Sequence, residues 1–334
     1  SLGSKVSLQG VIGKDEAAKE LKALVKARKV KGFFSSSSLP TISKLRLLAS
    51  RQQLLRIDAE EKFSIEDWSK TKALFSKIIS STKATVIVVS DYDKGTLRDI
   101  PFIIKQAAKK NIYTLIDPKG NDFSKYEGAN IITPNYLEFS NAVGGVSSES
   151  DLTLKAKNLI EDLKLEALLI TRGAEGMTLV VKQKGNMIRS DFSTQAQEVF
   201  DVSGAGDTVI AVASLCLASG IKYTDLSVLS SLAGGIVCKE VGVMPINKEK
   251  LLSEAIKLIC AAERPVIYAG GGLLKARASE ALKRFVELTG IHVVTTLMAR
   301  GVFPDRDPLC LGMPGMHGNY ASVMAFQRSD LLIN

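Results

Sequence analysis

Short runs of consecutive apolar, mostly β-branched residues alternate with longer segments in which apolar residues recur every three or four positions. Runs of the first kind predict buried strands, and periodic segments of the second kind predict amphipathic helices. The predicted elements are strands at 86–90, 113–117, 130–133 and 167–171 and helices at 97–110 and 148–163. This alternation predicts an α/β fold in which a mostly parallel sheet carries helices on both faces.

Three segments depart from this alternation. Residues 40–58 alternate apolar and polar positions on either side of Arg51-Gln52, and residues 176–200 do so around a turn at 184–186. Such period-two patterns predict antiparallel strand pairs added to the parallel sheet. Residues 33–39 contain four consecutive serines and predict a loop or the edge of a strand.

The second half of the chain predicts a new domain. Helical periodicity after residue 207 ends in the Gly-Val-Met-Pro stretch at 242–245. Before this break, helices are predicted at 208–217 and 225–239. After it, a second alternation of strands and helices begins, with helices at 251–262 and 278–288 and strands at 265–269 and 291–296. A length of 334 residues also suits about two domains. We therefore expect one domain over residues 1–247 and a second α/β segment over residues 248–334.

Composition narrows the class of protein. Apolar residues make up 46% and charged residues 24% of the chain, which is typical of a globular protein. No apolar run approaches the roughly 20 residues that cross a bilayer, and the first residues lack the apolar core of a signal peptide. We therefore expect a cytoplasmic protein with no membrane partner. With only His292 and His317, a histidine-based metal site or catalytic triad is not expected.

Charge and cysteine content add two expectations. The net charge is +9, but the basic residues are scattered rather than clustered, and the densest run at 18–32 has the pattern of a solvated helix face. This favours a phosphorylated small molecule over nucleic acid as the partner. The four cysteines form no Cys-x-x-Cys pair, and we expect them to be small buried apolar side chains.

The strongest chemical signal is the glycine-rich stretch Asp201-Val-Ser-Gly-Ala-Gly-Asp207-Thr208, which runs directly into an apolar helix. Small residues let backbone N–H groups point at an anion, and the following helix adds its positive N-terminal end. Such a cradle stabilises a transferring phosphoryl group, and a carboxylate beside it can take the proton from an attacking hydroxyl. The alternative is a glycine-rich turn that Asp207 caps.

The eight-residue stretch resembles the C-terminal signature of the PfkB/ribokinase carbohydrate kinases. Within this family, residues 1–245 resemble the kinase domain of bacterial heptose-7-phosphate kinases, which use ATP to phosphorylate C1 of D-glycero-D-manno-heptose 7-phosphate for lipopolysaccharide precursors. The narrower resemblance is carried by Pro40-Thr-Ile-Ser-Lys-Leu-Arg46, Gln52-Gln-Leu-Leu-Arg-Ile-Asp58, Ser90-Asp-Tyr-Asp-Lys-Gly95, Asp117-Pro-Lys-Gly120, Thr133-Pro-Asn-Tyr-Leu-Glu138 and Ser193-Thr-Gln-Ala-Gln-Glu-Val-Phe-Asp201. It implies a ribokinase-like fold, ATP and Mg²⁺ as cofactors, and a sugar phosphate as the small-molecule substrate.

The resemblance also implies roles for individual residues. Asp207 matches the catalytic base, and the anion hole is matched by Gly204, Ala205 and Gly206. Asn135 and Glu138 match the family's Asn-x-x-Glu motif, which organises Mg²⁺, held here through water, and the nucleotide phosphates. The loop that approaches those phosphates is matched by Thr171, Gly173 and Gly176. The alternatives are a solvated helix start for Asn-x-x-Glu and a simple strand-to-strand turn for the loop.

Contacts to the substrate are expected from four polar residues near predicted strand ends. Arg46, Lys94 and Lys119 are candidates for the sugar phosphate, because lysine and arginine are the usual partners of phosphate groups. Asp91 is a candidate for a sugar hydroxyl, with a turn cap as the alternative. Related kinases often form dimers through their lid strands, so the sequence leaves the choice between a monomer and a homodimer open.

The N-terminal part departs from the family. The first family strand, part of the lid and the Gly-Gly-x-x-Asn motif have no counterpart, and the resemblance begins near Gly10-Val-Ile-Gly13-Lys-Asp15. We therefore expect an unpaired sheet edge and an incomplete sugar site. A non-catalytic nucleotide-binding remnant or scaffold remains an alternative to a working kinase.

Residues 249–334 resemble the start of the central domain of thiamine-diphosphate enzymes of the acetohydroxyacid synthase type. The resemblance is carried by Arg264-Pro-Val-Ile-Tyr-Ala-Gly-Gly-Gly272, Val293-Val-Thr-Thr-Leu-Met-Ala-Arg-Gly-Val-Phe-Pro304 and Leu311-Gly-Met-Pro-Gly-Met-His-Gly318. It implies a Rossmann-like sheet that binds FAD in some members. The domains that hold thiamine diphosphate have no counterpart, so thiamine chemistry is not expected, and a fragment of such a synthase is the third alternative.

Overall fold

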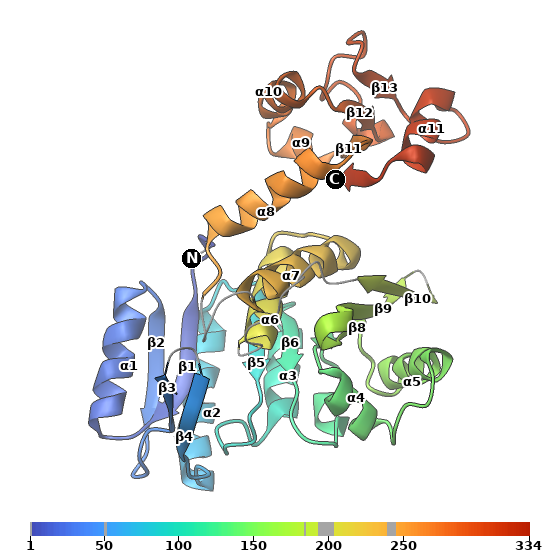
Figure 1. Cartoon of the computed structure of the whole chain (residues 1–334). Helices are drawn as coiled ribbons and strands as arrows, with labels where there is room; N and C mark the ends of the chain where they lie inside the picture. The colour runs from blue at the N-terminus through green and yellow to red at the C-terminus, as the bar shows by residue number, and fades with distance from the viewer. Residues whose placement is uncertain (1, 50–51, 184, 193–203, 239–244) are drawn as a thin grey trace. The chain divides into compact units, whose positions relative to one another are not determined.

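The computed structural model describes residues 2–49, 52–183, 185–192, 204–238 and 245–334, which divide into two compact units. Unit 1 comprises Ser1–Lys248 and unit 2 comprises Glu249–Asn334 (Figure 1). In the described part of the chain, every helix is too short or too polar to cross a bilayer.

The centre of unit 1 is a six-stranded sheet with the order β10-β9-β8-β7-β6-β5. Its strands are β5 (Val86–Ser90), β6 (Tyr113–Asp117), β7 (Ile131–Ile132), β8 (Ala167–Thr171), β9 (Met177–Gln183) and β10 (Asn186–Phe192). Strands β5 to β8 pair in parallel, and β9 and β10 extend the sheet antiparallel. The predictions of a parallel core and of an antiparallel pair after residue 176 are confirmed. Strand β5 forms one edge of this sheet.

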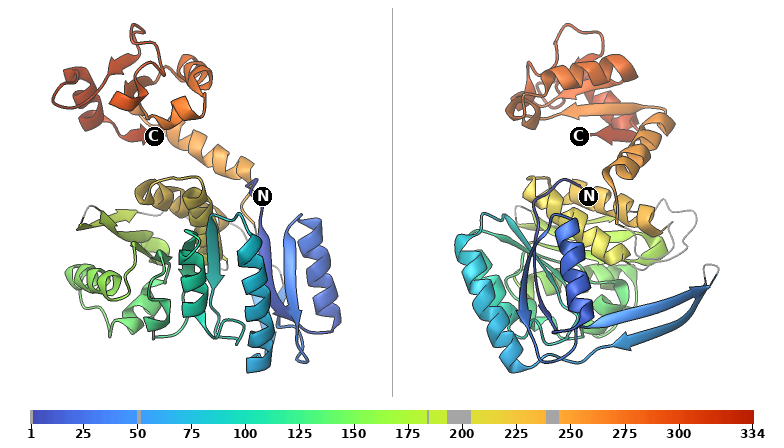
Figure 2. Two further views of the ribbon diagram at one scale, coloured as in Figure 1. Left: turned by 180° about the vertical axis from the view of Figure 1, so that it is seen from behind. Right: turned by 90° about the vertical axis from the view of Figure 1, so that its left-hand side faces the viewer.

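Helices cover both faces of the sheet (Figures 1 and 2). They are α2 (Ile65–Ser81), α3 (Ile100–Ala108), α4 (Tyr136–Ala142), α5 (Glu149–Asp162), α6 (Ala205–Ala218) and α7 (Tyr223–Cys238), with short 3₁₀ turns η1 (Ser124–Tyr126) and η2 (Gly173–Glu175). Side chains of α2 to α5, among them Trp68 and Phe139, form one core cluster with Ile116 and Leu168 of the strands. Helix α6 packs against β5 and β6, and α7 packs against β9 and β10.

Local capping decides where these helices begin. The helix predicted from residue 97 begins at Ile100, because the side chain of Asp99 accepts a hydrogen bond from the backbone N–H of Phe102 and Pro101 occupies the first turn. Ser64 and Asp67 form a capping box at the start of α2.

The N-terminal strands of unit 1 form a second, two-stranded parallel sheet of β1 (Ser7–Ile12) and β2 (Lys31–Ser36), joined by α1 (Glu16–Ala27). Of the two alternatives for residues 33–39, a loop or the edge of a strand, the strand is confirmed for residues 33–36, which belong to β2. Their backbone pairs with β1, and Ser35 packs beneath α2, where its hydroxyl group hydrogen-bonds that of Thr71 at 2.8 Å. Tertiary pairing therefore overrides the low strand propensity of consecutive serines.

The predicted strand pair at 40–58 is an antiparallel hairpin of β3 (Ser43–Ala49) and β4 (Gln52–Ala59). Figure 2 shows this hairpin as a ribbon that extends away from the rest of unit 1. Leu45 and Leu47 of β3 lie opposite Ile57 and Leu55 of β4, and all four are exposed. The alternate positions Lys44, Arg46, Arg56 and Asp58 are polar, so this part of the hairpin has one apolar and one polar face.

Unit 2 contains a four-stranded parallel sheet with the order β13-β12-β11-β14. Its elements are α8 (Lys248–Ala261), β11 (Pro265–Ala269), α9 (Gly272–Lys275), α10 (Ser279–Thr289), β12 (His292–Thr295), η3 (Leu297–Ala299), β13 (Cys310–Gly312), α11 (Tyr320–Arg328) and β14 (Leu331–Ile333). The expectation of buried cysteines is confirmed for Cys216 and wrong for Cys260, which is exposed because α8 has no buried residue.

Candidate active site

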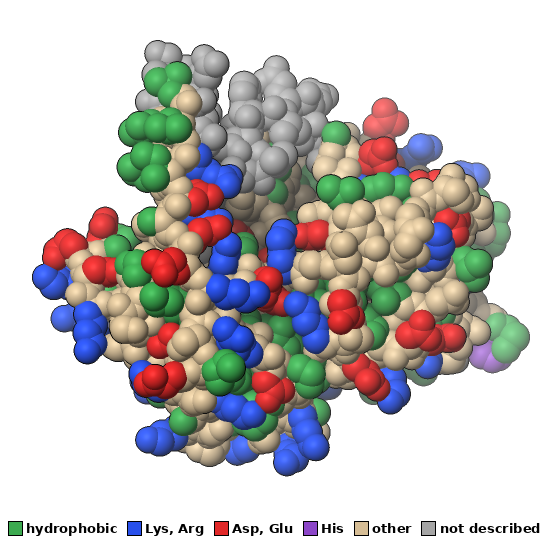
Figure 3. Space-filling view, turned by 90° about the horizontal axis from the view of Figure 1, so that it is seen from below, with side chains coloured by type: hydrophobic (Ala, Val, Ile, Leu, Met, Phe, Trp, Pro, Cys, Tyr) green, Lys and Arg blue, Asp and Glu red, His purple; other side chains and the backbone are tan. Residues whose placement is uncertain are grey.

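The site predicted from the sequence lies at the end of the six-stranded sheet where the parallel strands β5 to β8 have their carboxyl ends. This end of the sheet is called the sheet edge below. The backbone N–H of Asp91 donates to the carbonyl oxygen of Asp117 at 2.9 Å, and Asn135 forms a β-bridge with Thr171. These four predicted positions therefore lie on neighbouring strand ends. Lys, Arg, Asp and Glu side chains are intermixed around a hollow on this face of unit 1 (Figure 3).

Asp207 lies in the first turn of α6 at this edge. Gly204 caps the helix with φ of +82°, a backbone conformation that favours glycine. Apart from neighbouring residues of α6 itself, no described residue lies within 4 Å of a Cβ atom added to Gly206, so the described part of the chain leaves this side of the turn open. The hydroxyl of Tyr92, in the loop after β5, donates to Oδ1 of Asp207 at 3.0 Å. This contact joins the helix start to the carboxyl end of β5, while residues 201–203 lie outside the described residues.

Asp117 is surrounded by other carboxylates. Burial is the largest cause that raises its pKa from 3.8 to about 7, and the negative charges of Asp207 and Glu138 add to the increase. The same two carboxylates contribute to raising the pKa of Tyr92 well above its usual range, after burial as the main cause. Negative charge is therefore concentrated near the carboxyl ends of β5 and β6.

A pH-dependent gain in stability is expected from Asp117→Asn. The carboxyl pKa is about 7 in the folded protein and near 3.8 when unfolded, so the folded state binds this proton more tightly. The carboxylate therefore destabilises the fold as pH rises from about 4 to 7, and the full penalty is present above pH 7. Asparagine has no such penalty, so the variant should melt at a higher temperature than the unaltered protein at pH 8 and at a similar temperature near pH 4.5.

This expectation can be measured through the fluorescence of Trp68, which is the only tryptophan and belongs to the core of unit 1. A suitable control is Asp122→Asn, because hydrogen bonds from Ser124 lower the pKa of Asp122 and the variant should show no gain at pH 8. An equal or larger gain for Asp117→Asn at pH 4.5 than at pH 8 would contradict the expectation.

Asn135 and Glu138 form a reciprocal capping box at the start of α4. The side chain of Asn135 accepts from the backbone N–H of Glu138 at 2.8 Å, and Glu138 Oε2 accepts from the backbone N–H of Asn135 at 3.1 Å. Lys119 Nζ lies 3.2 Å from Glu138 Oε1. The helix-start alternative for this motif is therefore realised, and the same geometry fixes both side chains at the sheet edge.

The donor set fits an ion held through water. Magnesium in kinase sites keeps several waters and contacts few side chains directly. Asn135 Oδ1 and Glu138 Oε2 each accept one backbone hydrogen bond at the exposed ends of the strands, and each oxygen keeps a second lone pair for such waters. Among the described residues, no three acidic, histidine or cysteine side chains are grouped closely enough to hold a metal ion directly.

The loop after β8 contains the other predicted nucleotide contacts. Thr171 ends β8, and Gly173 and Gly176 both have positive φ, +60° and +92°. The backbone N–H of Arg172 donates to the carbonyl oxygen of Gly176 at 2.8 Å and closes a tight turn into β9. Because the backbone turns sharply at both glycines, other residues would strain this loop.

The predicted substrate contacts differ in their surroundings. Asp91 is 4% exposed; its carboxylate accepts from Lys125 Nζ at 2.6 Å, Tyr126 Oη at 2.8 Å and the backbone N–H of Asp93 at 2.9 Å. The turn-cap alternative for Asp91 is therefore present, and its oxygens are already engaged. Lys94 Nζ lies 2.6 Å from Glu60 Oε1 just after the β3–β4 hairpin.

Arg46 lies apart from the strand ends. It occupies the polar face of the hairpin, directly opposite Arg56. Two like charges at opposed positions of a strand pair repel each other, and Asp58 offsets part of this repulsion because its carboxylate lies 2.7 Å from Arg56 Nη2.

Two side chains at this edge were not selected from the sequence. Tyr92 and Lys125 contact Asp207 and Asp91, respectively. Tyr92 lies in the Ser90–Gly95 stretch that carries the family resemblance, and Lys125 lies in the turn η1, but neither signal pointed to a contact with another site residue. Their partners are far away in sequence, so the contacts arise from the strand order.

Comparisons with known proteins match two different families to two parts of the chain that correspond closely to unit 1 and unit 2. Residues 1–250 match the family described as pfkB family carbohydrate kinase, and residues 252–334 match the thiamine pyrophosphate enzyme central domain. The Bifunctional protein HldE of Haemophilus influenzae (strain PittEE) is 42% identical over 253 residues, which are 75% of this chain and 52% of that protein. HldE of Psychromonas ingrahamii is 43% identical with the same coverage. The chain thus spans about half the length of these curated relatives.

Solved structures share the fold of unit 1. Phosphofructokinase-2 from Escherichia coli in complex with potassium has a TM-score of 0.63 at 16% identity, covering 77% of this chain and 83% of that chain. Ribokinase from Giardia lamblia has a TM-score of 0.60 at 20% identity, covering 75% of this chain and 82% of that chain.

Proposed function

Because this chain belongs to the pfkB family of carbohydrate kinases, we propose that it transfers the γ-phosphoryl group of ATP to a sugar hydroxyl. The best substrate by resemblance is the C1 hydroxyl of D-glycero-D-manno-heptose 7-phosphate, with lipopolysaccharide precursor synthesis in the cytoplasm as the setting. The observation that carries the proposal is the position of Asp207, which lies in the first turn of α6 beside the open space at Gly206 and contacts the end of β5 through Tyr92.

The proposed chemistry uses groups of this chain. Asp207 accepts the proton of the sugar hydroxyl as its oxygen attacks the γ-phosphorus and the bond to ADP breaks. Backbone N–H groups over residues 204–207 and the positive end of α6 stabilise the charge on the transferring group. Asn135 and Glu138 orient the waters of a Mg²⁺ ion, which neutralises phosphate charge when bound. Thr171, Gly173 and Gly176 are proposed to approach the nucleotide phosphates.

The residues proposed to contact the sugar phosphate are selected by their positive charge. Lys94 and Lys119 lie at the strand edge, and Arg46 faces Arg56 on the hairpin, so all three are proposed to bind the sugar phosphate. Asp91 is proposed to act by holding Lys125 and Tyr126 in place.

The direct test measures ADP release from MgATP with and without heptose 7-phosphate, followed by identification of the phosphorylated carbon by NMR. Sugar-dependent release with a new phosphate on C1 is the expected result. MgATP binding without sugar-dependent release would instead support a nucleotide-binding remnant. Release with another sugar phosphate alone would keep the kinase and replace the substrate.

We also propose that the kinase domain comprises residues 1–247 and that residues 248–334 form a separate partial domain. The two compact units and the two family matches support this division. Limited proteolysis should cut the native chain near residue 247 and leave a stable N-terminal product; cleavage confined to the interior of either domain would contradict the boundary.

A further inference from the structure

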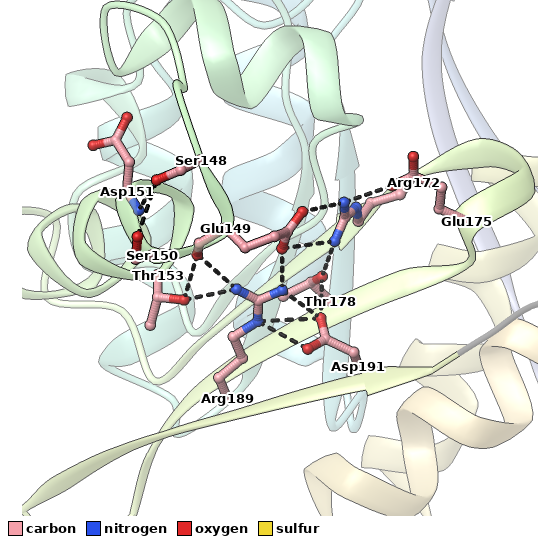
Figure 4. Close-up of polar contacts among 10 residues, drawn as sticks. All are labelled: Ser148, Glu149, Ser150, Asp151, Thr153, Arg172, Glu175, Thr178, Arg189 and Asp191. Carbon is pink, nitrogen blue, oxygen red and sulfur yellow. Dashed lines mark hydrogen bonds and ion pairs between the residues drawn. The ribbon is translucent and has the colours of Figure 1, made fainter.

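Two largely buried arginines share one carboxylate beside the loop after β8. Arg172 and Arg189 have side chains that are only 14% and 18% exposed. Arg172 contacts Glu149 through both terminal nitrogens, at 2.6 Å and 3.2 Å, and Arg189 Nη2 contacts the same carboxylate. Figure 4 shows Glu149 between the two guanidinium groups.

Further hydrogen bonds extend this cluster across three elements. Arg189 forms a forked contact with Asp191 at the end of β10, and its Nη1 donates to Thr153 Oγ1 of α5 at 2.7 Å. Thr178, at the start of β9, donates to Asp191 Oδ1 at 2.6 Å (Figure 4). The cluster therefore joins the start of β9 and the end of β10 to the first turn of α5.

The same cluster adjoins the candidate nucleotide site. Arg172 immediately follows Thr171, which forms a β-bridge with Asn135. Its guanidinium carbon lies 5.8 Å from the centre of the Tyr136 ring, the residue after Asn135. Arg172 thus contacts the helix that begins with the Asn-x-x-Glu motif while its backbone closes the loop at 172–176.

Glu149 is the carboxylate that both arginines of this cluster contact, so its negative charge links them. Arg172 first, and Arg189 second, hold the pKa of the Glu149 carboxyl below its usual range. Without that negative charge, Arg172 keeps Glu175 and Arg189 keeps Asp191 as a carboxylate partner, but the carboxylate that joins the two guanidinium groups is lost. Arg172, and with it the loop, would then lose its ionic link to β10 and α5.

We propose that Glu149, Arg172 and Arg189 are positioning residues that hold the loop at 172–176 in the geometry that receives the nucleotide polyphosphate. The inference rests on the proposed function, because it takes this loop as part of the nucleotide site. The arginines act through the loop backbone and not by contacting phosphate, since their terminal nitrogens are already engaged by carboxylates and hydroxyls.

The test measures the Kd for MgADP by calorimetry, which requires no turnover, in the full chain carrying Glu149→Gln. A matched control is Glu127→Gln, which removes the same charge from an exposed ion pair with Lys164 at 2.6 Å. We expect the Kd to rise about tenfold in Glu149→Gln and to stay within about twofold in the control. The KM for the sugar should be unchanged in both variants.

A purely structural role has a different signature. A lower melting temperature for Glu149→Gln with an unchanged Kd for MgADP would overturn the proposal. If Glu149→Gln does not fold, Arg172→Lys decides by the same criterion, because lysine keeps the charge and loses the two-nitrogen contact. An unaltered chain that binds MgADP without sugar-dependent turnover would refute the proposed function alone, whereas one that binds no MgADP would overturn both.

Discussion

Replacing Asp207 with asparagine is expected to lower sugar-dependent ADP release by roughly 10²–10⁴-fold while MgATP still binds. Asparagine has the same shape, and its amide oxygen can still accept the hydrogen bond that Tyr92 donates to Asp207 Oδ1. It cannot take a proton from the sugar hydroxyl. The change therefore removes the base and leaves the first turn of α6 and its backbone N–H groups in place.

Initial rates at saturating MgATP, with the Kd for MgATP measured separately, test this expectation. Asp162→Asn, at an exposed position on α5, makes the same chemical change elsewhere and should leave the rate unchanged. A variant of Asp207 that retains most of the rate would show that another group accepts the proton. A variant that loses MgATP binding as well would assign Asp207 a role in holding the nucleotide.

Phe139→Ala is expected to have the largest effect on stability, about 3–5 kcal/mol for unit 1. Phe139 is fully buried in the core cluster and follows Glu138 on α4. Its removal leaves a cavity under the helix that carries the Asn-x-x-Glu motif. Because this short helix has few other buried contacts, we expect weaker nucleotide binding together with the lower stability.

The matched control lies on the same helix. Leu137 is 68% exposed, so Leu137→Ala should change stability by no more than about 0.5 kcal/mol. Urea unfolding followed by Trp68 fluorescence reports on unit 1 alone, because no tryptophan lies in unit 2. A loss below about 1 kcal/mol for Phe139→Ala would mean that the surrounding helices collapse into the cavity.

Local patterns predicted most of the fold of unit 1. Ala167–Thr171 is a continuous apolar run whose first four residues are buried, as predicted for a strand inside a covered parallel sheet. Val86–Ser90 forms the predicted strand, but the prediction that it is buried holds only for Val89, because β5 lies at the edge of the sheet and Val88 is 40% exposed. For residues 33–36 the local pattern left a loop and the edge of a strand as alternatives, and pairing with β1 decides for the strand despite the low strand propensity of serine. Helices begin at other residues than predicted where a capping side chain such as Asp99 fixes the first turn.

The candidate site was predictable where its residues form a contiguous motif. The stretch ending at Asp207 carries its own physical signal, because small residues precede a helix and a carboxylate lies in its first turn. Isolated side chains carry no such signal. Tyr92 reaches Asp207 across 115 residues of sequence, and nothing near Tyr92 in the chain specifies that contact.

Periodicity and turn chemistry depend on neighbouring residues, so the strand–helix alternation and the glycine-rich motif could be recognised without the structure, and a domain boundary near residue 247 could be predicted. Which charges meet, in contrast, depends on how the strands are ordered in space. The raised pKa of Asp117 depends on Asp207 and Glu138, and Glu149 lies between Arg172 and Arg189. These groups come together because the parallel strands place their carboxyl ends at one edge and the antiparallel pair folds back beside α5, and such convergence depends on strand order.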